Sequence, residues 1–424
     1  MSASPPSPPR RPSGRHLRAS DLQAGAQLAT QATLGVIGIT EGVHQAVRRR
    51  IGLPAGALPE RAGGLTGRIY AAVRGVAQGI GGGIDGVLRS LQPLLDTAPD
   101  DDADSPARAA VVAALNGVLG DRLAALGNPL AQPMVLCAAG QPLAIGAPHR
   151  PAPFDRNPAL AKAVGSHALV MVHGLCMNDL QWRRDGHDHG EWLGAALHTQ
   201  PLYLRYNSGL HIATNGRSLA ALLQALSRQW PAALEGITLV GHSMGGLVAR
   251  SAVHEGLRAG HGWPGLLKHL VFLGTPHHGA PLERAGHGAD LLLASSPFSA
   301  PLARLGRLRS AGITDLRYGH LRSPDDGPSD APVGLPPGVA CFGVAACLAP
   351  ARGLLAERLV GDGLVPLRSA RGEHDDPARR LRFARESLRT VYRTGHLELL
   401  SSPAVADQLR LWLSPPSTTL GAAD

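Results

Sequence analysis

Aromatic side chains are scarce in this sequence: Phe, Trp and Tyr together supply 4% of its 424 residues, although 44% of the residues are hydrophobic. That apolar fraction is too high for a disordered chain, and a core with so few aromatics must be largely aliphatic. A chain of this length can bury a large core. We therefore expect one large domain with an appendage rather than several equal domains.

Lysine is almost missing. Of the 41 basic residues only Lys162 and Lys268 are lysines, and the formal net charge is +9. A nucleic-acid-binding domain typically gathers its basic residues into a stripe with interleaved aromatics. Here the arginines are scattered along the chain, with short clusters such as the one at residues 48–50. The charge pattern therefore argues against nucleic acid as a partner.

Cysteine is rare as well. Four cysteines in a chain this long, with no CxxC pair, do not indicate a disulfide framework. The four are Cys137, Cys176, Cys341 and Cys347. The last two could pair in principle, but both lie in an apolar run, and we expect small buried residues at these two positions.

Long apolar runs are absent too. Residues 1–18 are rich in Pro, Ser and Arg and contain no apolar segment of the kind found in signal peptides. No run of about 18 uninterrupted apolar residues occurs anywhere, which argues against a membrane-spanning helix. These features predict a cytoplasmic protein.

The first part of the chain reads as a separate region. Residues 1–20 predict a disordered tail and residues 416–424 a second one. Residues 21–127 are rich in Ala, Gly and Leu with apolar residues at helical spacing, which predicts a helical N-terminal appendage. Its amphipathic faces favour packing against a neighbouring element, and peripheral contact with a lipid or granule surface is the alternative.

From residue 130 to about 415 the pattern changes. Two short apolar segments, 134–137 and 142–145, predict a β-hairpin. Apolar strand segments then alternate with helical ones, which indicates a mostly parallel sheet with helices on both faces. The clearest expected strands are 167–172, 237–240, 269–273, 339–345 and 389–393, and a helix over 404–413 closes the domain. A less regular insertion at about 280–337 predicts loops or a lid over an active site.

The strongest local motif is a G-x-S-x-G sequence, Gly241 to Gly245, with Ser243 at its centre. It follows an expected strand and opens an expected helix, which is the setting of a nucleophile elbow. Small residues are needed two positions before and after the serine because the turn is so sharp. An ordinary helix-capping serine in a glycine-rich turn is the alternative.

A serine nucleophile needs a base held by a third group, and in this fold the chain order is Ser, acid, His. His396 follows the last expected strand, and Asp362 lies in a glycine turn after the preceding one. Both fit that order, although Asp between glycines is also a common turn formula. The nearest rivals, residues 374–376, form a polar His-Asp-Asp loop with no strand before it.

The oxyanion of a tetrahedral intermediate needs two N–H donors. One is expected from Met244, directly after the nucleophile. The other is expected from Leu175, because the sequence His173-Gly174-Leu175 follows the first central strand and the glycine lets the backbone turn inward. A buried strand that ends in His-Gly for structural reasons alone is the alternative.

Taken together, the segments VMVHGL, LVGHSMGG, LVFLGTPHHGAPLE and GDGLVP, with a final GH, resemble the bacterial lipase and esterase branch of the α/β-hydrolases, near the PGAP1-like and triacylglycerol-lipase groups. The resemblance covers residues 165–413. It implies an α/β-hydrolase fold, a triad of Ser243, Asp362 and His396, and oxyanion donors at Leu175 and Met244. It also implies that the GTPHHG segment borders the pocket.

The function expected from these features is hydrolysis of a carboxylic ester, lipid or other acyl ester, through an acyl-serine intermediate. Thioesterase, polyester depolymerase and acyltransferase activities use the same residues and stay open, as does a non-enzymatic binding protein with this fold. Adjacent histidines on a loop seldom both bind one ion, so His277 and His278 do not indicate a metal site. We expect no metal and no cofactor.

Overall fold

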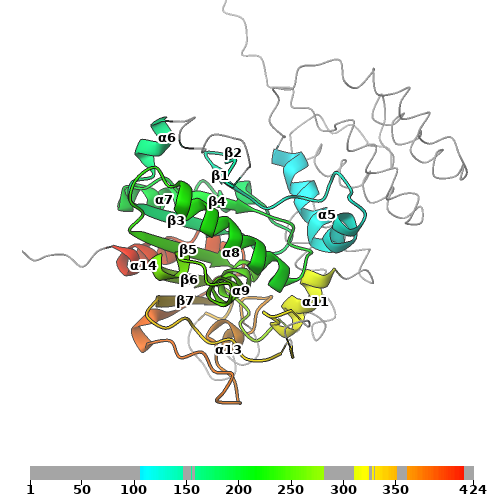
Figure 1. Cartoon of the computed structure of the whole chain (residues 1–424). Helices are drawn as coiled ribbons and strands as arrows, with labels where there is room; N and C mark the ends of the chain where they lie inside the picture. Colours follow the sequence, from blue (N-terminus) through cyan, green and yellow to red (C-terminus); the bar gives the residue numbers. More distant parts are fainter. Residues whose placement is uncertain are drawn as a thin grey trace, which may run out of the picture. The chain divides into compact units, whose positions relative to one another are not determined.

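The computed structural model describes residues 106–146, 154, 158–280, 310–323, 327–328, 330–350 and 361–414 (Figure 1). The chain divides into two units, residues 1–111 and 112–424. The expected tails, the N-terminal appendage up to residue 105 and residues 281–309 of the insertion expected over about 280–337 lie outside the described residues. The domain boundaries and the lipid-surface contact expected for the appendage therefore stay predictions.

The second unit is built around one eight-stranded sheet with the order β2-β1-β4-β3-β5-β6-β7-β8. Strands from β4 to β8 run parallel, whereas β1 is antiparallel to both β2 and β4. The mostly parallel sheet and the hairpin predicted from the sequence are confirmed. The strands are β1 (Val135–Ala138), β2 (Gln141–Pro142), β3 (His167–Val172), β4 (Leu202–Arg205), β5 (Gly236–His242), β6 (Leu267–Leu273), β7 (Ala340–Cys347) and β8 (Leu388–Tyr392).

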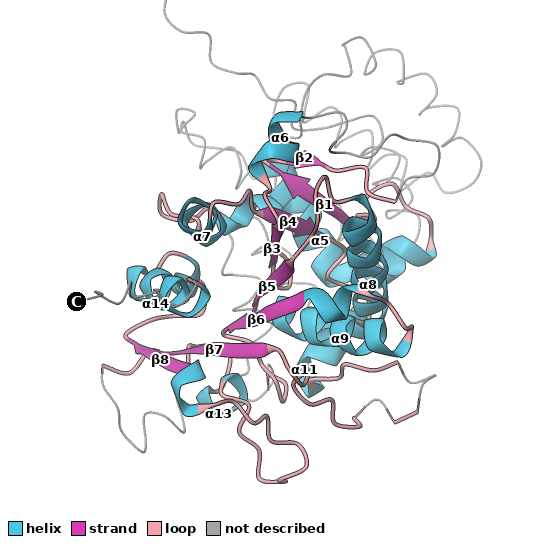
Figure 2. Ribbon diagram, turned by 60° about the vertical axis from the view of Figure 1, so that its left-hand side comes forward, coloured by secondary structure: helices cyan, strands magenta, loops and turns pink. Residues whose placement is uncertain are grey.

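Helices cover both faces of the sheet, as Figure 2 shows. Helices α7 (His189–Leu197) and α14 (Pro403–Leu413) pack together on one face, and α8 (Ile212–Gln229) and α9 (Met244–Arg258) pack together on the other. The expected closing helix is α14. The remaining elements are α5 (Pro106–Ala125), α6 (Pro158–Ala163), α11 (Ala311–Tyr318) and α13 (Leu367–Ala370), with 3-10 turns η1 (Asp179–Trp182), η2 (Trp263–Leu266), η5 (Arg385–Ser387) and η6 (Glu398–Leu400).

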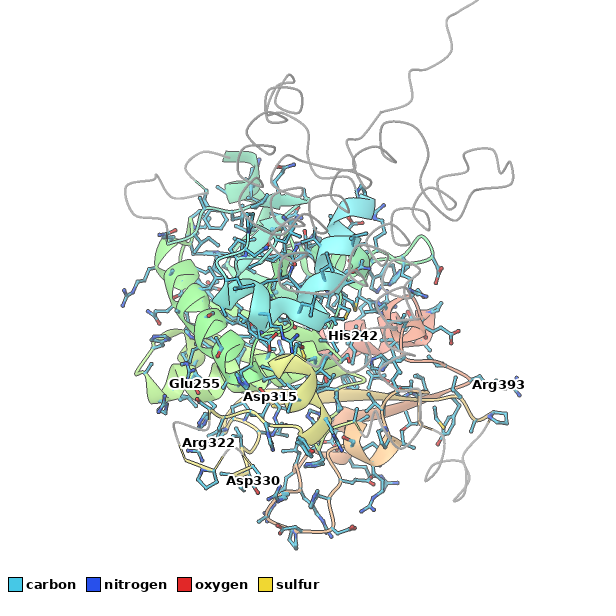
Figure 3. The ribbon with its side chains drawn as sticks, turned by 90° about the vertical axis from the view of Figure 1, so that its right-hand side faces the viewer. His242, Glu255, Asp315, Arg322, Asp330 and Arg393 are labelled. Atoms are coloured by element: carbon cyan, nitrogen blue, oxygen red, sulfur yellow. The ribbon has the colours of Figure 1, made fainter. Side chains whose placement is uncertain are left out.

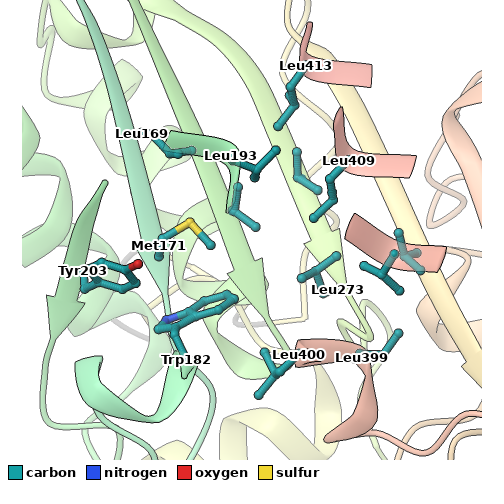
Figure 4. Close-up of a cluster of buried hydrophobic side chains, with 14 of the residues drawn as sticks. Leu169, Met171, Trp182, Leu193, Tyr203, Leu273, Leu399, Leu400, Leu409 and Leu413 are labelled. Carbon is teal, nitrogen blue, oxygen red and sulfur yellow. The ribbon is translucent and has the colours of Figure 1, made fainter. Parts of the chain in front are cut away.

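The core between the sheet and the α7/α14 layer is aliphatic, as the composition predicts (Figure 4). Leucines from β3, α7 and α14 meet there, and Trp182 and Tyr203 are its buried aromatic members. Trp182 is completely buried and fills the end of the cluster near the carboxyl edge of β3. Burying each leucine side chain of this cluster contributes about 1.5–3 kcal/mol, so this layer stabilises the packing of α7 and α14 on the sheet.

Helix α5 packs unusually closely on the carboxyl edge of the sheet. A Cβ added at Gly117 would overlap the Sγ atom of Cys176, and one added at Gly120 would overlap the side chain of Asn207. Glycine inside a helix costs about 1 kcal/mol relative to alanine. Here the two glycines let the helix backbone lie directly against the loops that follow β3 and β4.

All four cysteines are free thiols, and three of them are buried while Cys341 is half-buried. Within the part of the chain that the structure describes, no helix combines the length and apolarity needed to cross a bilayer.

Candidate active site

Ser243 occupies the turn between β5 and α9, with a strained backbone. Its φ is 54° and its ψ is −125°, a combination that non-glycine residues rarely adopt. The residue is 3% exposed, and its backbone N–H donates to the carbonyl oxygen of Leu273 at the end of β6, at 2.8 Å. The turn is therefore held on both sides, by its own helix and by the neighbouring strand.

The glycines around Ser243 are required by contact. A Cβ at Gly241 would lie 2.5 Å from the backbone of Gly246, and one at Gly245 would overlap the carbonyl oxygen of Val172 on β3. A Cβ at Gly246 would overlap the hydroxyl of Thr275. The small residues of the G-x-S-x-G motif thus let the start of α9 fold back against β3 and β6, which is the nucleophile-elbow geometry expected from the sequence.

His396 and Asp362 form a buried pair. The Nδ1 atom of His396 lies 2.7 Å from Oδ2 of Asp362, and their side chains are 3% and 1% exposed. The backbone N–H of His396 also donates to the carbonyl oxygen of Asp362, at 3.1 Å. An ionised carboxylate only accepts, so Nδ1 of His396 carries the proton in this pair, and in the neutral ring Nε2 is then the nitrogen with the lone pair. Nε2 is buried without a hydrogen-bond partner in the described structure.

The turn that carries Asp362 fixes its carboxylate. Oδ1 accepts hydrogen bonds from the N–H groups of Leu364 at 2.9 Å and Val365 at 2.7 Å, while Oδ2 faces His396. Gly361 has a φ of +51°, which allows this tight turn. The half-exposed side chain of Leu348 lies over the positions of Gly363 and Gly395, so it covers both turns of the pair.

Ser243 and His396 come to the same edge of the sheet from different strands. Ser243 follows β5, and its N–H contacts the last residue of β6; Gly274, the next residue, lies against the His396 ring, where an added Cβ would be 3.2 Å from Nδ1. Ser243 and His396 are not hydrogen-bonded to each other, since Nε2 of His396 has no partner. Hydrogen bonds between a nucleophile and its base are often long or poorly aligned without substrate, and they tighten when substrate binds.

The loop after β3 runs alongside Ser243. A Cβ at Gly174 would lie 3.1 Å from the Cβ of Ser243, and the carbonyl oxygen of His173 is held by the Tyr206 hydroxyl at 2.9 Å. Burial lowers the pKa of His173 to about 4, and its neutral ring stacks on Tyr206. Within the described residues, the N–H groups of Leu175 and Met244 donate no hydrogen bond. Both residues are buried.

His242 is a residue of this site that sequence reasoning missed. Its ring lies 4.8 Å from that of His396, centroid to centroid, and its Nε2 is 3.2 Å from the carbonyl oxygen of His396. Burial, and then the neighbouring His396, lower the pKa of His242 well below its usual value, so it is neutral. Figure 3 shows it among the central ribbons. Its place as the second residue of the motif was the available signal.

The rival residues at 374–376 take part in other interactions. Asp375 is exposed and pairs with Arg368 at 2.5 Å, and Asp376 pairs with Arg379 at 3.7 Å. The His374 ring packs against His278, 4.9 Å away between centroids. Among the described residues, no three His, Cys, Asp or Glu side chains are arranged to hold a metal ion.

A family model described as a PGAP1-like alpha/beta domain matches residues 165–295. The matched segment contains Ser243 and the loop after β3, but neither Asp362 nor His396. No curated protein matches the chain in sequence.

Similar solved structures include the mature lipase BlEst2 of Bacillus licheniformis, at 21% identity and a TM-score of 0.37 over 59% of this chain and 89% of that one. EstA from Clostridium botulinum shares 15% identity, with a TM-score of 0.38, over 59% and 88%. The NocB thioesterase domain, in covalent complex with a fluorophosphonate nocardicin G analogue, shares 17%, with a TM-score of 0.34, over 60% and 98%. The strand order and the turn at Ser243 are those of an α/β-hydrolase fold, and the family match covers residues 165–295 of it.

Proposed function

We propose that this α/β-hydrolase cleaves carboxylic esters through an acyl intermediate on Ser243. The observation that carries the proposal is the buried hydrogen bond between His396 and Asp362, at the same sheet edge as a serine held at a φ of 54°. A structural serine does not require such strain, and a lone buried His–Asp pair does not require a neighbouring strained serine.

In the first half-reaction, the Oγ of Ser243 attacks the carbonyl carbon of the ester. The serine proton passes to Nε2 of His396, whose lone pair is free because Nδ1 donates to Asp362. The tetrahedral intermediate then collapses, the bond between the carbonyl carbon and the alcohol oxygen breaks, and the alcohol leaves with the proton from His396. Asp362 orients the ring and stabilises its charged form.

In the second half-reaction, water attacks the acyl carbon and gives a proton to His396. The bond to Oγ breaks, Ser243 recovers its proton from His396, and the carboxylic acid is released. The N–H groups of Leu175 and Met244 stabilise the oxyanion in both steps. Their lack of a hydrogen-bond partner among the described residues supports this role.

The substrate class is an acyl ester, lipid or other. Thioesterase, polyester depolymerase and acyltransferase activities use the same three residues, and they differ only in the group that leaves or attacks. A binding protein without activity is the alternative from another class. It would usually have lost one of the three residues, and this chain keeps Ser243, Asp362 and His396.

The proposal is tested by hydrolysis of a p-nitrophenyl ester series, from acetyl to palmitoyl, with Ser243→Ala beside the wild type. We expect the variant to lose activity by roughly 10⁶-fold. Ser414→Ala is the matched control, because Ser414 is an exposed residue at the end of α14, and it should keep full activity.

The acyl length of the best substrate separates an esterase from a lipase. When no ester in the series is a good substrate, covalent labelling by a fluorophosphonate that is lost in Ser243→Ala still tests Ser243 as the nucleophile. Ester hydrolysis that survives in Ser243→Ala would overturn the proposal.

A further inference from the structure

A small polar cavity lies beyond the loop that follows β6. It has a volume of about 80 Å³ and is bounded by α9, the segment after α11 and the loop after α13. Three arginines and four histidines line it, and among its described lining residues Asp330 is the one acid. One water occupies roughly 10–15 Å³ by this kind of measure, so the cavity has room for a group of several heavy atoms.

Arg250 on α9 carries a buried charge beside this cavity. The residue is 4% exposed; its Nη1 group donates to Nδ1 of His277 at 3.2 Å, its Nη2 group donates to the carbonyl oxygen of Val333, and its Nε has no partner. Burial lowers the pKa of the guanidinium to about 10, which leaves it charged at neutral pH.

No carboxylate among the described residues compensates Arg250. Asp330 is exposed at the edge of the molecule in Figure 3 and pairs with Arg379 at 2.9 Å. Cys341 lies near enough to interact electrostatically with Arg250. Burial raises the pKa of its thiol to about 12, however, so the thiol is neutral and does not compensate the charge. An uncompensated buried charge is strongly destabilising, and a bound anion would remove that cost.

Two histidines of the cavity add unpartnered nitrogen atoms. The Nε2 atoms of His277 and His278 are buried without a hydrogen-bond partner. Because His277 accepts from Arg250 at Nδ1, its Nε2 carries the proton and is a free donor. Burial lowers the pKa of His278 to about 4, and the charges of Arg250 and Arg379 act in the same direction.

We propose that this cavity binds a small oxyanion, a carboxylate or a phosphate group, with Arg250 as its counter-ion and the Nε2–H group of His277 as a donor. Charge-assisted bonds from a guanidinium are the strongest that a protein offers to such a group. The proposal does not depend on ester hydrolysis, because none of these side chains belongs to the proposed triad or to the proposed oxyanion donors.

The test is isothermal titration of the full chain with sodium phosphate, and separately with sodium acetate. We expect binding of at least one of the two, weakened about tenfold or more in Arg250→Met. Arg250→Lys should recover part of the binding because it restores the charge. Arg228→Met is the control, since Arg228 is an exposed arginine in the last turn of α8, and its affinity should match the wild type.

Binding of acetate without phosphate would support a carboxylate as the occupant, and the reverse a phosphate. Equal binding by the wild type and a folded Arg250→Met protein would overturn the proposal, because the anion would then be bound elsewhere.

A second measurement needs no variant of Arg250. A bound anion favours the imidazolium form, so saturating phosphate or acetate should raise the pKa of His278 when its ring is followed by NMR. No heat of binding and no change in that pKa, with both anions, would also overturn the proposal.

Discussion

The Nδ1 atom of His396 and the Oδ2 atom of Asp362 are 2.7 Å apart, and both side chains are almost fully buried. The residues are 34 positions apart in sequence and meet because β7 and β8 are neighbouring parallel strands whose carboxyl ends open into the same edge. The pair fixes one tautomer of the histidine, and the first prediction tests that tautomer.

Asp362→Asn should keep the fold and lose activity. The amide can still accept from the N–H groups of Leu364 and Val365, but it no longer holds Nδ1–H of His396 in place. We expect kcat to fall by roughly 10³–10⁴-fold. Asp376→Asn is the matched control, an exposed carboxylate that should leave kcat unchanged. Steady-state kinetics on the best ester decides it, and similar losses in both variants would contradict the assignment of the acid.

Gly174→Ala should impair catalysis more than folding. The new methyl group would lie 3.1 Å from the Cβ of Ser243, so the loop that carries Leu175 must move by a few tenths of an ångström. A displaced oxyanion donor costs roughly 10²-fold in kcat. Gly265→Ala, where nothing lies within 4 Å of the added carbon, is the control. The comparison needs kcat and the melting temperature of both variants. A normal kcat in Gly174→Ala would argue against Leu175 as a donor.

His242→Gln should lower kcat by about tenfold and leave KM nearly unchanged, because His242 contacts the backbone and ring of His396 and so acts through the proposed base. His242→Ala should be worse, since it also removes the packing against His396. If KM rises in His242→Gln while kcat stays unchanged, His242 contacts the substrate instead.

Buried neutral histidines should make the protein sensitive to acid. Burial depresses the pKa of His173 from 6.5 to about 4, so between those values the unfolded chain binds the extra proton. The contribution of His173 to the free energy of unfolding keeps its full value above pH 6.5. It falls progressively as pH drops from 6.5 to about 4, at roughly 1 kcal/mol per pH unit near pH 5. Urea unfolding at pH 7 and pH 5 measures this slope.

His173→Gln should flatten that slope by about one proton, whereas His198→Asn should not change it, since His198 is exposed on a left-handed helix cap that asparagine tolerates. An unchanged slope in His173→Gln would show that the ring is already protonated in the folded protein.

Sequence patterns predicted those parts of the fold that depend on local chemistry. The strand–serine–helix turn needs its glycines within a few residues, and the turns before Asp362 and His396 follow strands with clear apolar patterns. Strand β4 was not predicted because it has only four residues, Leu-Tyr-Leu-Arg. The second arm of the hairpin was predicted over residues 142–145, whereas β2 covers Gln141–Pro142, and one further hydrogen bond joins the N–H of Leu143 to the carbonyl oxygen of Leu136.

Contacts between segments far apart in the chain could not be predicted, because they leave no recognisable pattern in the sequence. Arg250 and His277 meet across two elements, and Gly117 meets Cys176 although 59 positions separate them in the chain. Each looks ordinary in sequence, a helical arginine and a helical glycine. What each residue contacts depends on which elements the sheet order brings together. Only the three-dimensional structure therefore shows the charged cavity and the close packing of α5 against the loop after β3.

The close packing of α5 on the loop after β3 makes Cys176 a chemical reporter of the position of that helix. Cys176 comes directly after Leu175 in the loop that follows β3. It is 4% exposed, and burial raises the pKa of its thiol to about 12. It is inert to alkylating reagents while Gly117 lies against it. The rate at which Cys176 reacts with an alkylating reagent therefore measures how often α5 moves away from the loop that follows β3.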